Sequence, residues 1–266
     1  MTFQLALFGH PVKHSLSPQI QQNFAQQFNL KINYQLIDVR GDQLIQKVHE
    51  FFDQGGHGAN ITVPHKQSIM TVTDHLTERA QQAGAVNTLF KKKQQLWGDN
   101  TDGAGLLNDF NDKNISIKNK RILIIGAGGA VQGVLPNMVQ SQPKSIHISN
   151  RTLKKAEKLA QSSNLCHALS DTPINTSFDV IINAPSLGHQ GQSPDLEPEW
   201  LSLNTIAYDL SYRAAAQPFL TKCKSMGIQQ SYDGIGMLHH QAALAFALWF
   251  NHIPKQPLND KFRTNY

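Results

Sequence analysis

Cysteine is scarce in this chain of 266 residues, which contains only Cys166 and Cys223. The two are far apart and do not form a C-x-x-C pair. Disulfide-rich secreted scaffolds and structural zinc sites need more cysteines at closer spacing. We therefore expect no metal site, and we interpret the cysteines as buried or idle thiols in a reducing compartment, the cytoplasm.

Long apolar runs are also missing, since no stretch approaches the roughly 20 residues that span a bilayer. The N-terminus has no basic lead, and its short apolar run stops at Gly9-His10-Pro11. We interpret it as a first strand and not as a signal peptide. With 40% hydrophobic and 16% charged residues, the composition is typical of a soluble globular protein, and no membrane partner is expected.

Acidic residues are fewer than basic ones, 19 against 24, which gives a net charge of +5. This balance suits either acidic small molecules or nucleic acid. The basic clusters at residues 91–93 and 113–121 have no interleaved aromatic residues, as a nucleic-acid surface would have. The first cluster is expected in a solvated hairpin turn and the second in a loop, so no nucleic-acid partner is expected.

The most informative stretch is RILIIGAGGAVQGV at residues 121–134. An apolar run breaks at glycines and passes into helical spacing, which predicts the strand, tight turn and helix start of a nucleotide-binding unit. Without side chains in the turn, a pyrophosphate can reach the backbone N–H groups at the helix N-terminus. The third position of the G-x-G-x-x-G/A pattern is Val131, so a glycine-rich turn without a ligand is the alternative.

The next strand, residues 145–149, ends at Asn150 and Arg151. An NAD-binding unit carries Asp or Glu near this point to bind the ribose 2′-hydroxyl. A guanidinium with Lys154 and Lys155 nearby suits a 2′-phosphate instead, so the sequence favours NADP. For each lysine, an ordinary place on the helix surface is the alternative.

Two serines follow the first strand. Ser17 precedes Pro18, and this pair predicts a helix with Ser17 as its N-cap, which gives that serine a sufficient structural reason. Ser15 has no such reason. Its hydroxyl can donate to a bound anion, although a solvated loop serine is the alternative.

Lys66 follows a buried strand, residues 58–63, and Pro64 is expected to open a helix there. In the first turn of that helix, the positive end of the dipole would favour the neutral amine. This placement makes Lys66 a candidate general base. The alternative is a lysine that merely points outward.

Asp102 stands where the first αβ half of the chain gives way to the glycine-rich unit, and ligands gather at such junctions. Thr101 or Asp102 can also cap the helix that follows, which explains an acidic residue without catalysis. Gln241 lies inside a long predicted helix, residues 237–250, where a glutamine is usually a surface residue.

These residues belong to seven blocks that occur in one order and together span nearly the whole chain. The blocks are HSLSP at 14–18, NITVPHK at 60–66, GAVNTL at 84–89, GDNTDGAG at 98–105, GAGGA at 126–130, NRT at 150–152 and GMLHHQA at 236–242. In these blocks the chain resembles the shikimate dehydrogenase family.

The resemblance implies an α/β fold with two domains. Residues 1–101 would form an αβ domain for substrate binding and catalysis, and residues 102–236 a doubly wound, Rossmann-type NADP domain. Residues 237–266 would return to the first domain as a C-terminal helix. The implied activity is NADP-linked interconversion of shikimate and 3-dehydroshikimate, in the biosynthesis of chorismate and the aromatic amino acids, by a monomer or homodimer.

The resemblance also assigns roles to single residues, with Lys66 and Asp102 as the catalytic pair. The substrate-binding residues would be Ser15, Ser17 and Thr62 at the carboxylate, Asn87, Asp102 and Gln241 at the ring hydroxyls, and Lys66 and Tyr212. The cofactor-binding residues would be Gly126, Ala127, Gly128, Gly129, Ala130, Asn150, Arg151, Thr152, Lys155 and Gly234.

The chain departs from the family pattern on the cofactor side. Pro185 replaces the usual threonine of Asn-Ala-Thr-Ser, Ala214 the usual proline after Tyr212, and Gln217 the usual threonine. These changes bear on NADP affinity more than on substrate identity. A relative that takes quinate or prefers NAD, and a silent metabolite sensor that binds without turnover, are the competing interpretations.

Overall fold

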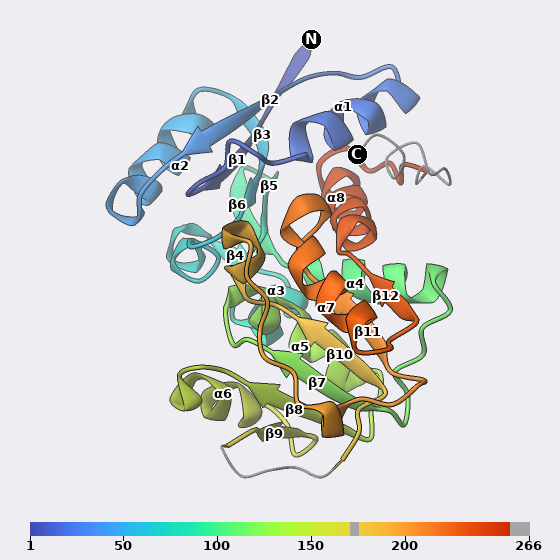
Figure 1. The fold of residues 1–266 in the computed structure, drawn as a ribbon. Coiled ribbons are helices and arrows are strands. Elements are labelled where there is room, and N and C mark those ends of the chain that lie inside the picture. Colours follow the sequence, from blue (N-terminus) through green and yellow to red (C-terminus); the bar gives the residue numbers. More distant parts are fainter. Residues whose placement is uncertain (171–175, 256–266) are drawn as a thin grey trace.

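The computed structural model describes residues 1–170 and 176–255. Two six-stranded sheets lie one above the other along the length of the molecule (Figure 1). The upper sheet comes from the first part of the chain and the lower sheet from the part after residue 120. Within the described residues, no helix is both long enough and apolar enough to cross a membrane.

The first sheet has the strand order β2-β1-β3-β5-β6-β4. Its strands are β1 Thr2–Gly9, β2 Lys31–Asp38, β3 Gly56–Ile61, β4 His75–Leu76, β5 Thr88–Lys92 and β6 Gln95–Asp99. The helices of this half are α1 Ser17–Gln27, α2 Leu44–Asp53 and α3 Glu78–Ala83, with short 3₁₀ helices η1 Gly41–Gln43 and η2 Ser68–Val72.

Strands β5 and β6 form the predicted hairpin, with Lys93 and Gln94 at its turn. Both turn residues have positive φ, 51° and 63°, as in the type I′ turn that matches the twist of a hairpin. Because the side chains of residues 91–95 are exposed, the first basic cluster lies in the expected solvated turn.

The second sheet is parallel throughout, with the order β12-β11-β10-β7-β8-β9. Its strands are β7 Arg121–Ile125, β8 Ser145–Ser149, β9 Cys166–Ala168, β10 Val180–Asn183, β11 Ile206–Asp209 and β12 Gln230–Tyr232. The connecting helices are α5 Gly129–Gln140, α6 Leu153–Ala160 and α7 Gln217–Ser225, with η3 Ser186–Gln190, η4 Pro198–Trp200 and η5 Arg213–Ala215. Counted from β7, the order is that of a dinucleotide-binding sheet, whose crevice lies at the carboxyl ends of the strands, where the order reverses.

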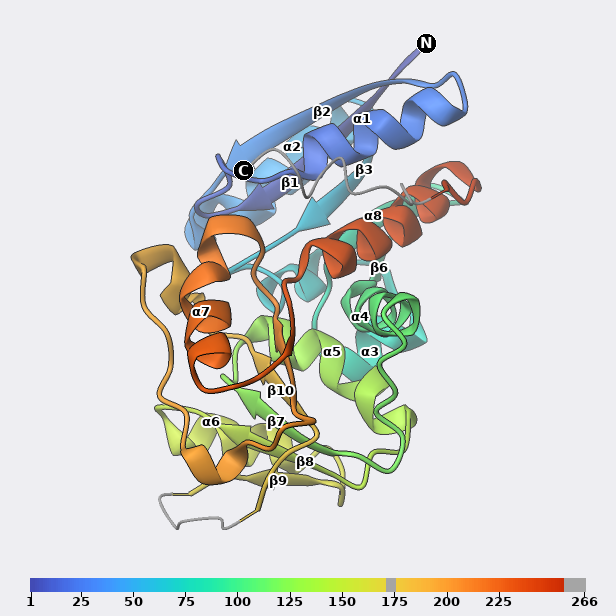
Figure 2. The ribbon, with the colours of Figure 1, turned by 45° about the vertical axis from the view of Figure 1, so that its right-hand side comes forward.

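Helices α4, Asp102–Asp112, and α8, Ile235–Phe250, lie between the two sheets (Figure 2). Helix α8 packs on α4 and also returns to the first sheet. The Trp249 Nε1 donates to the Leu89 carbonyl of β5 at 3.0 Å, and the buried Gln21 of α1 donates to the Ala242 carbonyl at 3.0 Å. The division at residues 101 and 236 stays a prediction, and residues 256–266 of the third segment lie outside the described part.

The sequence of residues 74–82 predicts one continuous helix, but the first part of this prediction is wrong. The Asp74 carboxylate accepts a hydrogen bond from the Leu96 N–H at 2.7 Å, and residues 75–76 pair with β6 as strand β4. The helix begins only after Thr77, whose hydroxyl accepts from the Ala80 N–H at 3.3 Å as an N-cap. Pairing with a distant strand outweighs local helical spacing here.

Candidate active site

An ion pair between Lys66 and Asp102 joins the two halves of the molecule. The Lys66 Nζ lies 2.5 Å from the Asp102 Oδ2, and the two side chains are only 12% and 6% exposed. A lysine that merely points outward is therefore excluded. Burial strengthens such a charged hydrogen bond because little water competes for either group.

The expected helix around Lys66 is wrong. A cis peptide bond precedes Pro64, the following residues form turns, and the next helical segment, η2, begins at Ser68. The Lys66 carbonyl accepts a hydrogen bond from the Val86 N–H at 2.7 Å, which ties this turn to the sheet. The helix that begins at this site is α4, with Asp102 in its first turn, so its dipole stabilises the carboxylate.

Asn87 links the Lys66–Asp102 pair to the other polar side chains of the site. Its Nδ2 lies 2.8 Å from the Asp102 Oδ1, 2.9 Å from the Thr101 Oγ1 and 3.4 Å from the Gln241 Oε1. Gln241 is half-buried on α8 and not a surface residue as its place in the helix suggested. Thr101 occupies the N-cap position of α4 without a side-chain capping bond, because its hydroxyl contacts Asn87 and the Gln241 carbonyl instead.

The predicted carboxylate-binding serines contact each other. The Ser15 hydroxyl donates to the Ser17 Oγ at 3.1 Å, and the Ser17 N–H donates back to the Ser15 Oγ at 3.2 Å. Leu16, not Ser17, occupies the N-cap position of α1, which has no side-chain capping bond. The capping explanation for Ser17 is therefore wrong, and its 6% exposed side chain needs another reason.

Tyr34 and Asn60 link these serines to Asn87, and sequence reasoning missed both as site residues. The Tyr34 hydroxyl donates to the Asn60 Oδ1 at 2.8 Å and also contacts Ser17. The Asn60 Nδ2 donates to the Asn87 carbonyl at 3.2 Å. Burial raises the pKa of Tyr34, so its hydroxyl keeps its proton and remains a donor. Asn60 opens the NITVPHK block, whereas nothing local distinguishes Tyr34.

Thr62 and Tyr212 approach the same region from opposite halves. Thr62 follows β3 directly, and its N–H donates to the Phe8 carbonyl at 2.9 Å. Tyr212 follows β11, and its hydroxyl hydrogen-bonds with the backbone of Leu16, between the two serines. Burial raises the pKa of Tyr212, so its hydroxyl also stays protonated. Tyr212 thus reaches from the second sheet to the serine loop.

The glycine-rich turn has the geometry expected of a phosphate-binding turn. Gly126 has a φ of +109°, which only glycine adopts readily, and a Cβ there would lie 3.3 Å from the Pro185 nitrogen. Gly128 occupies the N-cap position of α5 without a side-chain capping bond. A Cβ at Gly128 or Gly129 would meet nothing within 4 Å, so the helix start faces open space. The residues present therefore fit a bound pyrophosphate.

Gly133, which sequence reasoning passed over, brings α5 close to the ion pair. A Cβ at this position would lie 2.9 Å from the Asp102 Oδ2 and 3.3 Å from the Asn100 Nδ2. A larger residue would push the helix away from Asp102. The RILIIGAGGAVQGV stretch contains this glycine, but only the fold shows what it contacts.

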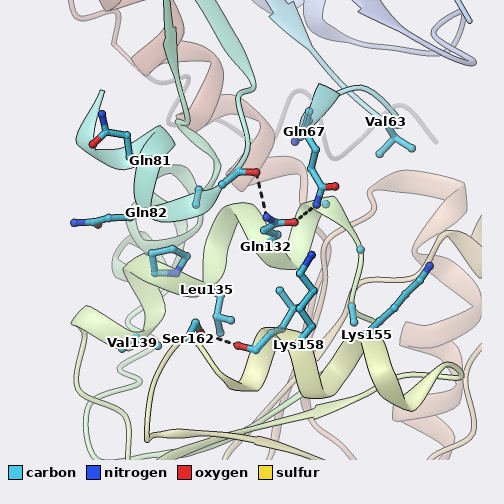
Figure 3. A pocket seen from close by; sticks show the side chains of 18 of the residues that line it. Val63, Gln67, Gln81, Gln82, Gln132, Leu135, Val139, Lys155, Lys158 and Ser162 are labelled. Carbon is cyan, nitrogen blue, oxygen red and sulfur yellow. Dashed lines mark hydrogen bonds between the residues drawn. The ribbon is translucent and has the colours of Figure 1, made fainter. Parts of the chain in front are cut away.

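A cavity of about 920 Å³ connects Lys66 with the glycine-rich turn (Figure 3). Its walls include Lys66 and Gln67 on one side and Gly128, Gly129, Gln132 and Lys155 on the other. Lys158 also points into it. Among the described residues that line it there are three lysines and no Asp or Glu, so its electrostatic character suits an anion.

Of the predicted cofactor residues, Ala127 also lines this cavity, whereas six do not: Gly126, Ala130, Asn150, Arg151, Thr152 and Gly234. Asn150 donates from its Nδ2 to the Thr152 carbonyl at 2.9 Å, which closes the loop after β8. Arg151 is exposed, and no carboxylate of the described residues lies within ion-pair distance of it. Its guanidinium is therefore available to an external anion.

Gly234, at the N-cap of α8, touches the end of β11. A Cβ there would lie 2.4 Å from the Leu210 carbonyl oxygen, so glycine is needed for this close approach. Asp209, the residue before Leu210, is fully buried. Its carboxylate accepts hydrogen bonds from the Asn183 Nδ2 at 2.7 Å and from the Ser211 N–H at 2.7 Å. Burial raises the pKa of Asp209 from 3.8 to about 6. Asp209 thus fixes the loop that leads to Tyr212.

Asp209 should make the stability of the protein depend on pH. The folded state binds more protons than the unfolded state between the two pKa values, about 4 and about 6, so this group's contribution to stability falls as pH rises through that window. Relative to wild type, Asp209→Asn should gain about 2 kcal/mol in free energy of unfolding from pH 4 to pH 7. Urea unfolding at several pH values measures this, and a difference that does not change with pH would contradict it.

The chain matches two family models, one in each half. Residues 7–89 match the shikimate dehydrogenase substrate binding domain, and residues 109–190 match the shikimate / quinate 5-dehydrogenase domain. A shikimate dehydrogenase (NADP(+)) from Colwellia psychrerythraea is 40% identical over 98% of this chain and 97% of its own length. The chain belongs to the shikimate dehydrogenase family.

Other members of the shikimate dehydrogenase family agree in sequence and in fold. A shikimate dehydrogenase (NADP(+)) from Aeromonas salmonicida is 40% identical over 91% of this chain and 90% of its own. The crystal structure of shikimate 5-dehydrogenase from Thermus thermophilus in complex with NADP(H) and shikimate is 31% identical. It superimposes with a TM-score of 0.85 over 95% of both chains. The expected family and two-domain α/β class are therefore confirmed.

Among the described residues, no group of three His, Cys, Asp or Glu side chains is placed to hold a metal ion. Both Cys166 and Cys223 are free and buried, as their spacing suggested.

Proposed function

We propose that this protein is an NADP-dependent shikimate dehydrogenase, which reversibly reduces 3-dehydroshikimate to shikimate in the biosynthesis of chorismate and the aromatic amino acids. The observation that carries the proposal is the buried Lys66–Asp102 pair, held at 2.5 Å beside a cavity that leads to the glycine-rich turn. A carbonyl reductase needs a proton donor beside its dinucleotide cofactor, and the Lys66 ammonium near the dinucleotide-binding turn can act as that donor.

The substrate carboxylate would bind at the serine loop. Ser15, Ser17 and Thr62 supply hydroxyl donors, and Tyr34 holds Ser17 through its own hydroxyl. The ring hydroxyls would bind to Asn87, Asp102 and Gln241, which already contact one another through the Asn87 amide. Tyr212 would close the site from the cofactor side, where it contacts Leu16.

NADP would bind along the carboxyl edge of the second sheet. The backbone of Gly126, Ala127, Gly128, Gly129 and Ala130 would hold the pyrophosphate at the start of α5. The 2′-phosphate would bind to Asn150, Arg151, Thr152 and Lys155, because a guanidinium offers paired donors and Lys155 adds charge at the cavity wall. Gly234 would lie near the nicotinamide. When bound, NADPH supplies the hydride.

The remaining step is proton transfer, which residues of the protein carry out. As the substrate carbonyl is reduced, its oxygen gains negative charge and needs a proton. The Lys66 ammonium donates that proton and becomes a neutral amine. Asp102 orients the ammonium and the substrate hydroxyl, and Asn87 holds Asp102 in place. In the reverse direction the neutral Lys66 amine takes the hydroxyl proton.

Formation of NADPH from NADP and shikimate tests the proposed function. We expect rapid turnover with shikimate and NADP, and slower turnover when NAD replaces NADP or quinate replaces shikimate. Comparable rates with quinate would make the protein a broader shikimate and quinate dehydrogenase. Binding of shikimate and NADP without turnover would replace the enzyme with a metabolite sensor, and binding of neither would reject the proposal.

We further infer that the enzyme acts in the cytoplasm as a monomer or homodimer. The two free, buried cysteines support a reducing compartment. Light scattering of the purified chain would measure its mass in solution and decide between monomer and dimer.

A further inference from the structure

Gln132 connects the cofactor side of the molecule to the substrate side. It lies in the first turns of α5, and both ends of its amide contact the other half of the chain (Figure 3). The Gln132 Nε2 donates to the Gly84 carbonyl at 3.1 Å, and the Gln132 Oε1 accepts from the Gln67 Nε2. One side chain thus bridges two separate segments of the substrate half.

Both partners of Gln132 lie next to the predicted catalytic and substrate-binding residues. Gln67 follows Lys66 directly in the chain. Gly84 begins the segment in which the Val86 N–H donates to the Lys66 carbonyl at 2.7 Å, and Asn87 comes next. A shift of α5 relative to either segment would therefore be transmitted to Lys66 or to Asn87.

The contact with Gly84 has a specific backbone requirement. Gly84 ends helix α3 in the left-handed conformation, with a φ of +57°. A Cβ there would lie 2.8 Å from the Gln132 Nε2. Glycine therefore serves both the helix end and the approach of the amide.

We propose that Gln132 is a positioning residue that sets the start of α5 in register with the Lys66 turn. Gly128 and Gly129, at the start of the same helix, face the space where the proposed function places the pyrophosphate. Hydride transfer requires the two reacting carbons to be held in near-contact geometry, and small misplacements are costly. The inference rests on the proposed function, because it concerns the alignment of NADP with the substrate.

The chain contains a matched control on the same helix. Gln140, at the C-terminal end of α5, lines the same cavity but contacts neither the Lys66 turn nor Gly84; its Nε2 donates to the Gln82 Oε1 of α3 at 2.9 Å. It has the same side chain and joins the same two halves, but it is exposed and two turns farther from Gly128. A general loss of contact between the halves would affect both variants alike.

The experiment compares Gln132→Ala, Gln67→Ala, the double variant and Gln140→Ala. We expect Gln132→Ala to lower the single-turnover rate of NADPH formation by about tenfold, the size of one or two lost hydrogen bonds. Binary binding of shikimate should stay unchanged, because neither Gln67 nor Gly84, the two partners of Gln132, is among the proposed shikimate contacts. Gln67→Ala should cause a smaller loss, and the double variant should be no slower than Gln132→Ala, because the shared bond is lost only once.

Three results would overturn the inference. Gln132→Ala and Gln140→Ala could lower the rate by the same factor, or the rate losses of Gln132→Ala and Gln67→Ala could multiply in the double variant. The third such result is a Gln132→Ala variant in which only the KM for shikimate changes. Small-angle scattering keeps the test independent of the proposed function. If the wild type turns over no shikimate, the proposed function fails. The bridge is still supported if Gln132→Ala has a larger radius of gyration than Gln140→Ala. Equal radii of gyration for the two variants would reject the bridge.

Discussion

Replacing Lys66 with alanine should lower kcat for shikimate oxidation by about a hundredfold to ten-thousandfold, the range supplied by a positioned proton-transfer group. Shikimate should still bind, with a Kd raised by no more than about tenfold, because Ser15, Ser17 and Asn87 keep their contacts. Steady-state rates of NADPH formation and calorimetric binding of shikimate measure the two quantities.

The variant should remain folded, since Asp102 keeps two sources of stabilisation when its partner is lost. Its Oδ1 still accepts from the Asn87 Nδ2 at 2.8 Å, and its place in the first turn of α4 favours the negative charge. Thermal unfolding of Lys66→Ala checks this directly. Lys47→Ala, an exposed lysine on α2 paired with Glu50, provides a control that should leave kcat unchanged.

Added primary amines separate proton transfer from loss of charge. A small alkylamine that enters the space left by Lys66 should raise the rate of Lys66→Ala, and the gain should follow the fraction of neutral amine in the oxidative direction. If Lys66→Ala keeps kcat within about tenfold of wild type, general acid–base catalysis by Lys66 is refuted. If in addition Asp102→Asn abolishes turnover, Asp102 is the proton carrier.

The nucleotide-binding half could be predicted from sequence because its signals are local. The apolar run 121–125 forms β7, and the glycines after it form the turn that leads into α5. The hydrophobic periodicity and the turn residues alone are enough to predict such a unit. The strand order of the sheet and the way α8 returns to β5 depend on pairings between distant residues, and only the resemblance to a family suggested that α8 returns.

The surroundings of Lys66 show where local reasoning fails. Proline at a first helical position is a good signal in general, yet Pro64 follows a cis bond and Lys66 is held by Val86, twenty residues away. The sequence therefore suggested a general base for a wrong physical reason, a helix dipole that is absent from this turn. The partner that does act on Lys66 is Asp102, which the chain brings close only in three dimensions.

The residues that sequence reasoning missed share this property. Tyr34, Asn60, Gln132 and Gly133 owe their importance to contacts with segments far along the chain. Their residue types are ordinary for strands, loops and helices. The role of a polar side chain in such a position depends on which buried donors and acceptors it bonds. Those partners are known only once the fold is known.

Replacing Arg151 with alanine should raise the KM for NADP by about a hundredfold, the cost of losing a charged, bidentate contact with a phosphate. The KM for NAD should change by less than about threefold, because NAD has no 2′-phosphate for the guanidinium to bind. Turnover at saturating NADP should remain close to wild type, since Arg151 is not among the hydrogen-bond or ion-pair partners of Lys66 and Asp102. The preference for NADP over NAD should therefore collapse by a similar factor.

Lys144→Ala is the matched control, because Lys144 is an exposed cation that precedes β8, whereas Arg151 follows the other end of this strand. It should change the KM for NADP by less than about threefold, as expected for a screened surface charge. Raising the salt concentration should weaken NADP binding more in the wild type than in Arg151→Ala. The variant has lost one of the charge pairs with NADP that salt screens. Equal losses in the two variants would mean that general positive potential attracts NADP, and the assignment of Arg151 to the 2′-phosphate would then be wrong.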